Sequence, residues 1–239
     1  MTEWSAQPGK RAEPEEATTT MATKQTYERL TAEELAAMSE LLHSLDPAQW
    51  DAPSLCEGWK VRHVVGHVCL GSSISPLSMP VRLIPFGFNV PKASSVMSYR
   101  YGDEHTREQM LDTWDRVVRV GKPGLSKLVP ASEFFADKLI HHQDIRRPLG
   151  LAREIPREHL TTALDALGEI GGFMQTKKVV KGLRLVATDI DYSVGPAANG
   201  APEVRGPAES IVLSVSGRPL DLGRLEGDGV NLLRQRISA

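Results

Sequence analysis

The sequence predicts an α+β protein in which a bundle of about four helices precedes a small C-terminal α/β domain. Apolar residues recur with helical spacing up to about residue 174, and shorter apolar runs separated by Gly and Pro follow them. The 239 residues, of which 41% are hydrophobic, can bury one large core or two modest ones. We place the domain boundary between residues 174 and 182, which gives domains at 25–175 and 176–239.

The chain is predicted to begin with a disordered tail at residues 1–24, because this segment has almost no apolar periodicity. The first helix is expected to start at Thr31, a suitable N-cap residue. Glu34 follows three residues later and would complete a capping box. The apolar spacing that supports this helix extends to Leu45.

A second helix is predicted after the turn-rich segment 47–58. Four valines form its apolar face: Val61, Val64, Val65 and Val68. Residues 71–92 are rich in Ser, Pro and Gly and lack a clean period, so we expect a long loop or short helices around a pocket.

Three further helices are predicted, at residues 106–120, 131–147 and 156–174. The helix at 131–147 should end before Pro148 and Gly150, since both residue types terminate helices. After residue 174 the apolar residues occur in short runs separated by Gly and Pro. Strands are expected at 183–190 and 192–194, and helices at 207–216 and 229–237.

Composition argues against several classes of protein. The 28 basic and 30 acidic residues give a formal net charge of -2, so no broad positive field favours a nucleic-acid partner. The two cysteines, Cys56 and Cys69, suggest no disulfide framework, and we assign both a structural role. No secretory signal or apolar stretch of about 20 residues is present, which favours a cytoplasmic protein without a membrane partner.

Three side chains are candidate metal ligands on spacing alone. Asp137 and His141 lie four residues apart and so share one helix face, while His67 projects from the flank of the valine stripe. Two simpler interpretations stay open: a surface hydrogen bond between Asp137 and His141, and a half-buried His67 bonded to a carbonyl. His63 falls nearly opposite the centre of the stripe, and using it with His67 would turn the site away from the core.

Two motifs carry a family resemblance. Residues 54–62, SLCEGWKVR, followed by the sequence VVGH that ends at His67, resemble the opening motif of the mycothiol-dependent maleylpyruvate isomerase family. This family belongs with the DinB-like metalloenzymes. Residues 137–150, DKLIHHQDIRRPLG, resemble its later motif. Segments at 182–189, 204–208 and 217–219 are similar to the family's small C-terminal domain, which is of the sterol-carrier type.

The resemblance implies that His67, Asp137 and His141 bind a divalent metal, with water or substrate completing the coordination. Zinc is the expected ion, because two imidazoles, one carboxylate and an open position form a recognised catalytic zinc arrangement. The characterised isomerases have glutamate where this chain has Asp137, so manganese, nickel or iron are also candidates. Glu133, one turn earlier, is an alternative ligand. Asp144 could accept a hydrogen bond from a ligand imidazole, or could instead pair with Arg147 on the helix surface.

The expected function is that of an enzyme that uses mycothiol as thiol cofactor or co-substrate and isomerises or conjugates a small electrophile. Arg218 and Arg205 are the candidate catalytic residues, because a guanidinium could bind a substrate carboxylate. Two alternatives remain: a metal-dependent hydrolase that activates water at the same site, and a helical protein that binds a ligand without turnover. The chain is expected to be a monomer or a homodimer.

Overall fold

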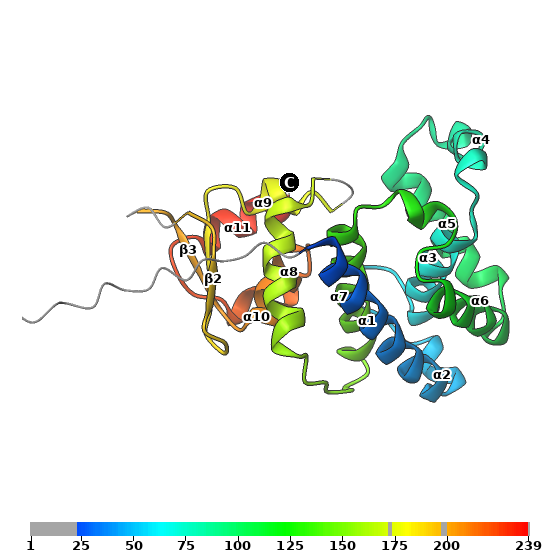
Figure 1. The fold of residues 1–239 in the computed structure, drawn as a ribbon, viewed down its shortest axis with the longest axis horizontal. Coiled ribbons are helices and arrows are strands. Elements are labelled where there is room, and N and C mark those ends of the chain that lie inside the picture. Colours follow the sequence, from blue (N-terminus) through cyan, green and yellow to red (C-terminus); the bar gives the residue numbers. More distant parts are fainter. Residues whose placement is uncertain (1–22, 172–173, 197–199, 239) are drawn as a thin grey trace, which may run out of the picture.

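The computed structural model describes residues 23–171, 174–196 and 200–238. The predicted tail therefore lies outside the described residues up to residue 22. The described chain is mostly helical and carries one small sheet near its C-terminal end, which confirms the α+β fold class. Figure 1 shows the sheet at one end of the molecule, the helix α7 (Ala131–Arg146) in the middle and a group of helices beyond it.

Four helices form the predicted bundle: α1 (Lys24–Ser44), α3 (Val61–Ser73), α6 (Arg107–Val120) and α7. Each of α1 and α3 packs against both α6 and α7, so the four make a closed ring. The apolar faces of α1, α3 and α6 meet in one buried cluster, whose members include Met38, Val64 and Trp114. Helical periodicity was therefore a sound guide to this part of the chain.

The start of α1 differs from the prediction. Thr23 is the N-cap, and its hydroxyl accepts a hydrogen bond from the backbone N–H of Thr26 at 3.2 Å. Thr31 lies inside the helix, where its hydroxyl donates to the carbonyl of Tyr27 at 2.6 Å. The predicted capping box was wrong because Glu34 is fully buried and accepts hydrogen bonds from Arg153, in the connection after α7, and from His159 of α8.

The segment after α3 contains short helices, as predicted, but it also contains a long helix that was not predicted. The short elements are η1 (Pro76–Ser78), α4 (Met79–Leu83) and η2 (Ile84–Phe86). The missed helix is α5 (Val90–Glu104), which packs along α3. Its apolar pattern is weak because small residues, including Ala93, Ser98 and Gly102, form much of its buried face.

The packing of α5 against α3 buries His63, which the valine stripe alone suggested would face away from the core. The His63 side chain is only 1% exposed; its Nε2 lies 3.0 Å from Asp103 Oδ1, and its ring stacks on Tyr99. Gly66 and Gly102 permit this close approach, since a Cβ at Gly66 would lie 2.9 Å from the backbone N of Gly102.

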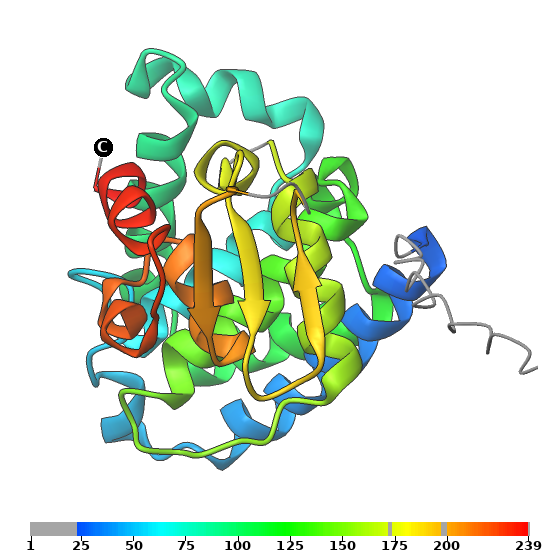
Figure 2. The ribbon, with the colours of Figure 1, turned by 90° about the vertical axis from the view of Figure 1, so that its left-hand side faces the viewer.

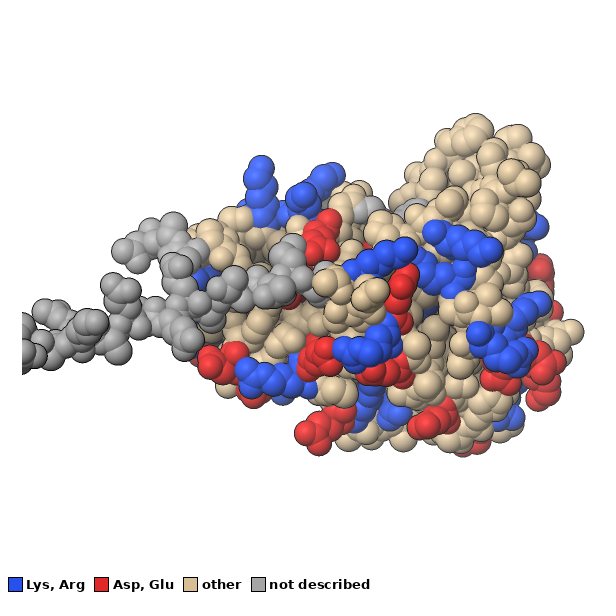
Figure 3. Space-filling model, in the orientation of Figure 1, with Lys and Arg blue, Asp and Glu red and all other residues tan. Residues whose placement is uncertain are grey.

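The α4 region forms a projecting lobe with an apolar surface. Its exposed apolar side chains are Leu77, Val81, Ile84 and Phe88. On the face drawn in Figure 3, the lobe around α4 shows no charged side chain, whereas acidic and basic groups are interspersed lower on the molecule. Among the described residues, no single helix has the length and apolar composition of a membrane span, although the bent pair Val61–Ser73 and Pro76–Phe86 passes that test together.

The C-terminal part is a three-stranded sheet covered by helices on one face (Figure 2). The strands are β1 (Arg184–Ala187), β2 (Tyr192–Val194) and β3 (Glu203–Gly206), in the order β2-β1-β3. β1 pairs antiparallel with β2 and parallel with β3, with Leu185 opposite both Val194 and Val204. β3 was not predicted.

Helices α8 (Arg157–Glu169) and α10 (Ala208–Val215) pack against each other and against the sheet. The remaining elements are α2 (Pro47–Trp50), η3 (Gly124–Leu128), α9 (Thr176–Val179), η4 (Pro219–Arg224) and α11 (Val230–Ile237). A second buried apolar cluster joins the sheet, α8, α10 and one face of α7. Helix α7 is thus buried on nearly all sides, and its polar side chains need partners inside the protein.

Candidate metal centre

Helix α7 presents a row of polar side chains toward α3. Asp137 and His141 lie one turn apart, which brings Asp137 Oδ1 within 3.3 Å of His141 Nε2. His67 comes from α3, and its Nε2 lies 3.7 Å from the same Asp137 oxygen. The centroids of the two imidazole rings are 5.0 Å apart. The structure therefore brings together the three side chains that the sequence singled out.

The three donor atoms lie within 4.8 Å of one another and converge on one point. Two donors that are each about 2.1 Å from a tetrahedral zinc ion are about 3.4 Å apart. The separations of 3.3 and 3.7 Å from Asp137 Oδ1 to the two imidazole nitrogens are close to this value. Two imidazoles and one carboxylate also form a donor set that catalytic zinc sites use. The residues present therefore fit a divalent ion.

Each of these three side chains is held by a further polar group. His67 Nδ1 lies 3.2 Å from Ser98 Oγ of α5, and His141 Nδ1 lies 2.8 Å from Asp144 Oδ2. Both imidazoles thus turn Nε2 toward the common point, because Nδ1 is engaged on the other side of the ring. The second oxygen of Asp137 pairs with the ammonium group of Lys138, which leaves Oδ1 directed at the imidazoles.

Asp144 is buried, and it connects His141 to the C-terminal part of the chain. Arg218 donates from Nε to Asp144 Oδ1 at 2.9 Å and from Nη2 to Oδ2 at 2.5 Å. Cys56 Sγ also donates to Oδ2, at 3.2 Å. Of the two contacts considered for Asp144, the structure shows the one with the imidazole of His141. Arg147 pairs instead with Asp221, at 2.5 Å.

Cys56, His141 and Asp144 form a second group of donors within 4.8 Å of one another. This group is a poor cation site, because the guanidinium of Arg218 already occupies both oxygens of Asp144 and contacts Cys56 Sγ. A metal ion there would meet a fixed positive charge.

The charges of the site favour an ionised carboxylate between two imidazoles. Burial by itself would raise the pKa of Asp137, but the Lys138 ammonium and the His141 imidazole outweigh it and hold that pKa well below its usual value. Burial lowers the pKa of His67. Burial also opposes a charge on His141, yet the carboxylates of Asp137 and Asp144 raise its pKa well above the usual value. Metal binding would therefore displace a proton from His141.

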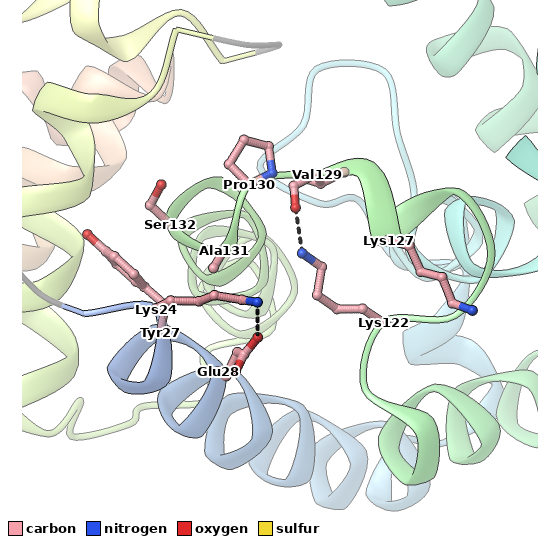
Figure 4. A pocket seen from close by; sticks show the side chains of 9 residues that line it. All are labelled: Lys24, Tyr27, Glu28, Lys122, Lys127, Val129, Pro130, Ala131 and Ser132. Atoms are coloured by element: carbon pink, nitrogen blue, oxygen red, sulfur yellow. Dashed lines mark hydrogen bonds and ion pairs between the residues drawn. The ribbon is translucent and has the colours of Figure 1, made fainter.

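The donors open onto a cavity of about 520 Å³ between α3, the start of α5 and the first turns of α7. Arg218, Cys56 and Trp59 also line it, and the rest of the wall is largely apolar with several serines. A second hollow of about 500 Å³, drawn in Figure 4, lies beyond Val129 and is lined by Lys24, Lys122 and Lys127. Among the described residues that line this second hollow there is no histidine or cysteine, so the candidate metal donors lie only at the first cavity.

Comparison with known proteins relates this geometry to a family. Residues 31–120 match the family model described as the mycothiol maleylpyruvate isomerase N-terminal domain. This chain carries that domain. The match confirms the resemblance predicted from the sequence, and the matched region contains His67 and Ser98. A search of curated proteins finds no match.

Two solved structures of a mycothiol-dependent maleylpyruvate isomerase share the fold. A histidine-to-alanine mutant is 19% identical, with a TM-score of 0.56, and the alignment covers 86% of this chain and 93% of that one. A second structure, whose description names no mutation, is 20% identical, with a TM-score of 0.50. The alignment covers 82% of this chain and 90% of that one. The likeness extends beyond the maleylpyruvate isomerase N-terminal domain into the sheet-containing part.

The two candidate arginines lie outside the matched region 31–120, and only one of them lines the cavity. Arg218 lines the cavity, but its guanidinium is committed to Asp144 and to the carbonyl of Ser216. Arg205 lies on β3 with an exposed side chain that pairs with Glu203 at 3.2 Å. Arg205 does not line the cavity, because its strand directs the side chain into solvent.

Several site residues were missed by the sequence reasoning. Ser98 belongs to the helix that was not predicted, and Lys138 follows Asp137 but turns back to pair with it while packing on the ring of Phe134 at 4.4 Å. Glu133, the alternative ligand, lines the cavity but is not among the donors that converge. Cys69 is buried against the carbonyl of Met110, in keeping with a structural role.

Proposed function

We propose that this protein is a metal-dependent enzyme that uses mycothiol as thiol cofactor or co-substrate and isomerises or conjugates a small electrophile. One observation carries the proposal. The Nε2 atoms of His67 and His141 and Oδ1 of Asp137 converge at the wall of a cavity, in a chain that carries the maleylpyruvate isomerase N-terminal domain.

His67, Asp137 and His141 would hold the metal, and zinc is the ion we propose. A divalent ion bound there would lower the pKa of a coordinated thiol from about 8.5, so that it reacts as the thiolate at neutral pH. The shorter side chain of Asp137, compared with the glutamate of characterised family members, still places its oxygen within 3.7 Å of both imidazole nitrogens. We therefore expect Asp137 to bind through Oδ1 while Lys138 neutralises Oδ2.

The chain's own residues would orient the reacting groups and keep water out. Ser98 and Asp144 fix the imidazoles, and Arg218 holds Asp144 from behind. We assign Arg218 this positioning role rather than direct contact with substrate. The apolar cavity wall would shield the thiolate from water, which strengthens its interaction with the ion.

Metal content and thiol consumption together test the proposal. Purified protein should contain about one equivalent of divalent metal, and His67→Ala and His141→Ala should each lose most of it. His43→Ala is the matched control, because His43 is half-exposed and pairs with Asp115 away from the cavity. A metal-free wild-type protein, or equal metal loading in all four proteins, would rule out the ligand assignment.

Turnover is tested separately with two electrophiles. Conjugation is followed as loss of the mycothiol thiol in the presence of monobromobimane, and isomerisation as conversion of maleylpyruvate to its isomer, because isomerisation regenerates the thiol. We expect metal-loaded wild type to accelerate the reaction and the two ligand variants to lose that acceleration. Acceleration that persists without added thiol, with release of a hydrolysed product, would point instead to a hydrolase. The protein is proposed to act in the cytoplasm as a monomer or homodimer.

A further inference from the structure

We propose that the electrophile bound in this cavity is uncharged and apolar, and is not a dicarboxylate such as maleylpyruvate. This inference rests on the proposed function for the thiol chemistry, but the ligand preference follows from the cavity alone. Two independent features of the wall support it: the extent of its apolar surface and the engagement of its cations.

Apolar side chains of several segments form much of the wall away from the metal donors, and the hydroxyl groups of Ser72, Ser94, Ser95 and Ser126 also line it. Val68 and Ile74 come from α3 and its C-cap, Met79 from α4, Val90 and Met97 from α5, and Phe134 from α7. The methionines are unbranched and polarisable, so they can adapt to planar or irregular apolar groups. A volume of about 520 Å³ is within the range of cavities that enclose small organic ligands.

The cations of the wall are already paired. Among the described lining residues, the lysine and arginine side chains are Lys138 and Arg218. Lys138 is only 4% exposed at its side chain and pairs with Asp137. Arg218 is 15% exposed at its side chain, and its three nitrogens donate to Asp144 and to the carbonyl of Ser216.

A substrate carboxylate would therefore meet no unpaired lysine or arginine among the described lining residues. To pair with either cation it would have to displace Asp137 from Lys138 or Asp144 from Arg218, and either change would disturb a proposed metal ligand or its support. The coordination position at the ion is assigned to the thiol, so it does not offset this cost.

The chemistry can be followed with an uncharged probe, 1-chloro-2,4-dinitrobenzene. The mycothiol sulfur forms a bond to the ring carbon that carries chlorine, the carbon–chlorine bond breaks, chloride leaves with the electron pair, and the thiol proton passes to solvent. With maleylpyruvate the carbon–sulfur bond would form and then break again, so that the thiol is regenerated. Both reactions balance without an oxidant or a reductant.

Binding tests the inference independently of turnover. Metal-loaded protein is titrated calorimetrically with unreactive 1,3-dinitrobenzene and with maleate. We expect dinitrobenzene to bind at least about tenfold more tightly, because an unpaired carboxylate loses its hydration in the cavity. Maleate binding as tight as or tighter than dinitrobenzene would overturn the inference. If neither 1-chloro-2,4-dinitrobenzene nor maleylpyruvate gives thiol-dependent turnover while the binding preference holds, the proposed function fails and the ligand class stands.

Val90→Lys adds a cation to the apolar wall, at a partly exposed position where α5 begins. It should reduce the preference for dinitrobenzene over maleate by about tenfold or more. Ile84→Lys is the matched control, because Ile84 is 61% exposed on the same lobe and does not line the cavity. The control should leave the preference within about twofold of wild type. Equal preferences in all three proteins would contradict the assignment.

Discussion

Arg218 and Asp144 form a two-point ion pair between the C-terminal part of the chain and α7, with Nε and Nη2 of the arginine donating to the two carboxylate oxygens. Asp144 in turn holds Nδ1 of His141 at 2.8 Å. The geometry at the proposed ligand His141 therefore depends on a residue 77 positions later in the sequence (218 − 141 = 77).

Replacing Arg218 should weaken metal binding even though Arg218 does not contact the three donor atoms. Arg218→Lys keeps the charge but loses the planar fork, so Asp144 would be held at one point instead of two. We expect metal affinity to fall by about 10–100-fold, as for other partners of ligand residues. Competition with a chromophoric chelator measures the affinity. Arg205→Lys, on the exposed face of β3, should match wild type; an equal loss in both variants would refute the positioning role.

The contact between Gly66 and Gly102 predicts a stability effect that is coupled to the site. A Cβ at Gly66 would lie 2.9 Å from the carbonyl oxygen of Ser98, the residue that contacts His67. Gly66→Ala should therefore push α5 away from α3, cost about 1–3 kcal/mol of unfolding free energy and weaken metal binding. Gly71→Ala, on the same helix with nothing within 4 Å, should be neutral or stabilise by up to about 1 kcal/mol. Urea unfolding compares the two variants.

The metal donors could be predicted from the sequence because they depend on local spacing and on motifs. Asp137 and His141 share a helix face by periodicity alone, and the motif ending at His67 supplied the third candidate. Their supporting groups could not be found in this way. Ser98 lies on a helix whose buried face is formed largely of small residues, and the pairing of Arg218 with Asp144 depends on how distant segments pack.

In the fold, too, features set by local sequence were predicted and features set by contacts between distant residues were not. Bundle helices with regular apolar spacing were predicted, whereas the start of α1 was misplaced because Thr31 and Glu34 form a capping pattern inside a longer helix. Glu34 is instead the buried acceptor for His159 and Arg153, two residues far along the chain. Tertiary hydrogen bonding therefore decided the role of a side chain that its local pattern assigned to a helix end.

The environment of His159 predicts a specific dependence of stability on pH. Burial alone would lower the pKa of His159, but hydrogen bonds to Glu34 and Glu33 outweigh it and raise that pKa. A group with a raised folded-state pKa contributes stability that is complete below its unfolded pKa, about 6.5, and is lost as pH rises through the folded value. Wild type should therefore lose stability relative to His159→Gln as pH rises from about 6 to 9.

Urea unfolding of both proteins across this range isolates the contribution of His159, because other titrating groups are common to the two chains. Glu34 stays ionised throughout, since burial alone would raise its pKa but hydrogen bonds from His142, His159 and Arg153 outweigh burial and lower that pKa. A difference between the two proteins that is constant with pH, or that grows toward high pH, would contradict the raised pKa of His159.

Removal of the metal should lower the melting temperature. The metal concentration needed for this stabilisation should depend on the groups that hydrogen-bond to the ligand side chains. An ion present at 100 times its dissociation constant stabilises the folded state by about 2.7 kcal/mol, which corresponds to roughly 5–10 °C in Tm for a chain of this size. Chelation should abolish this shift in wild type. His67→Ala should show no shift from the start, because His67 supplies one of the three donors.

Ser98→Ala should have an effect between those of wild type and His67→Ala, because it removes only the hydroxyl that lies 3.2 Å from His67 Nδ1. Loss of one neutral hydrogen bond of about 1 kcal/mol should weaken metal binding by about fivefold, so more metal is needed for the same rise in Tm. Saturating metal should then restore the full stabilisation in Ser98→Ala but not in His67→Ala. A rise in Tm with added metal that is identical in all three proteins would place the ion elsewhere, because neither the donor nor its support would then affect its binding.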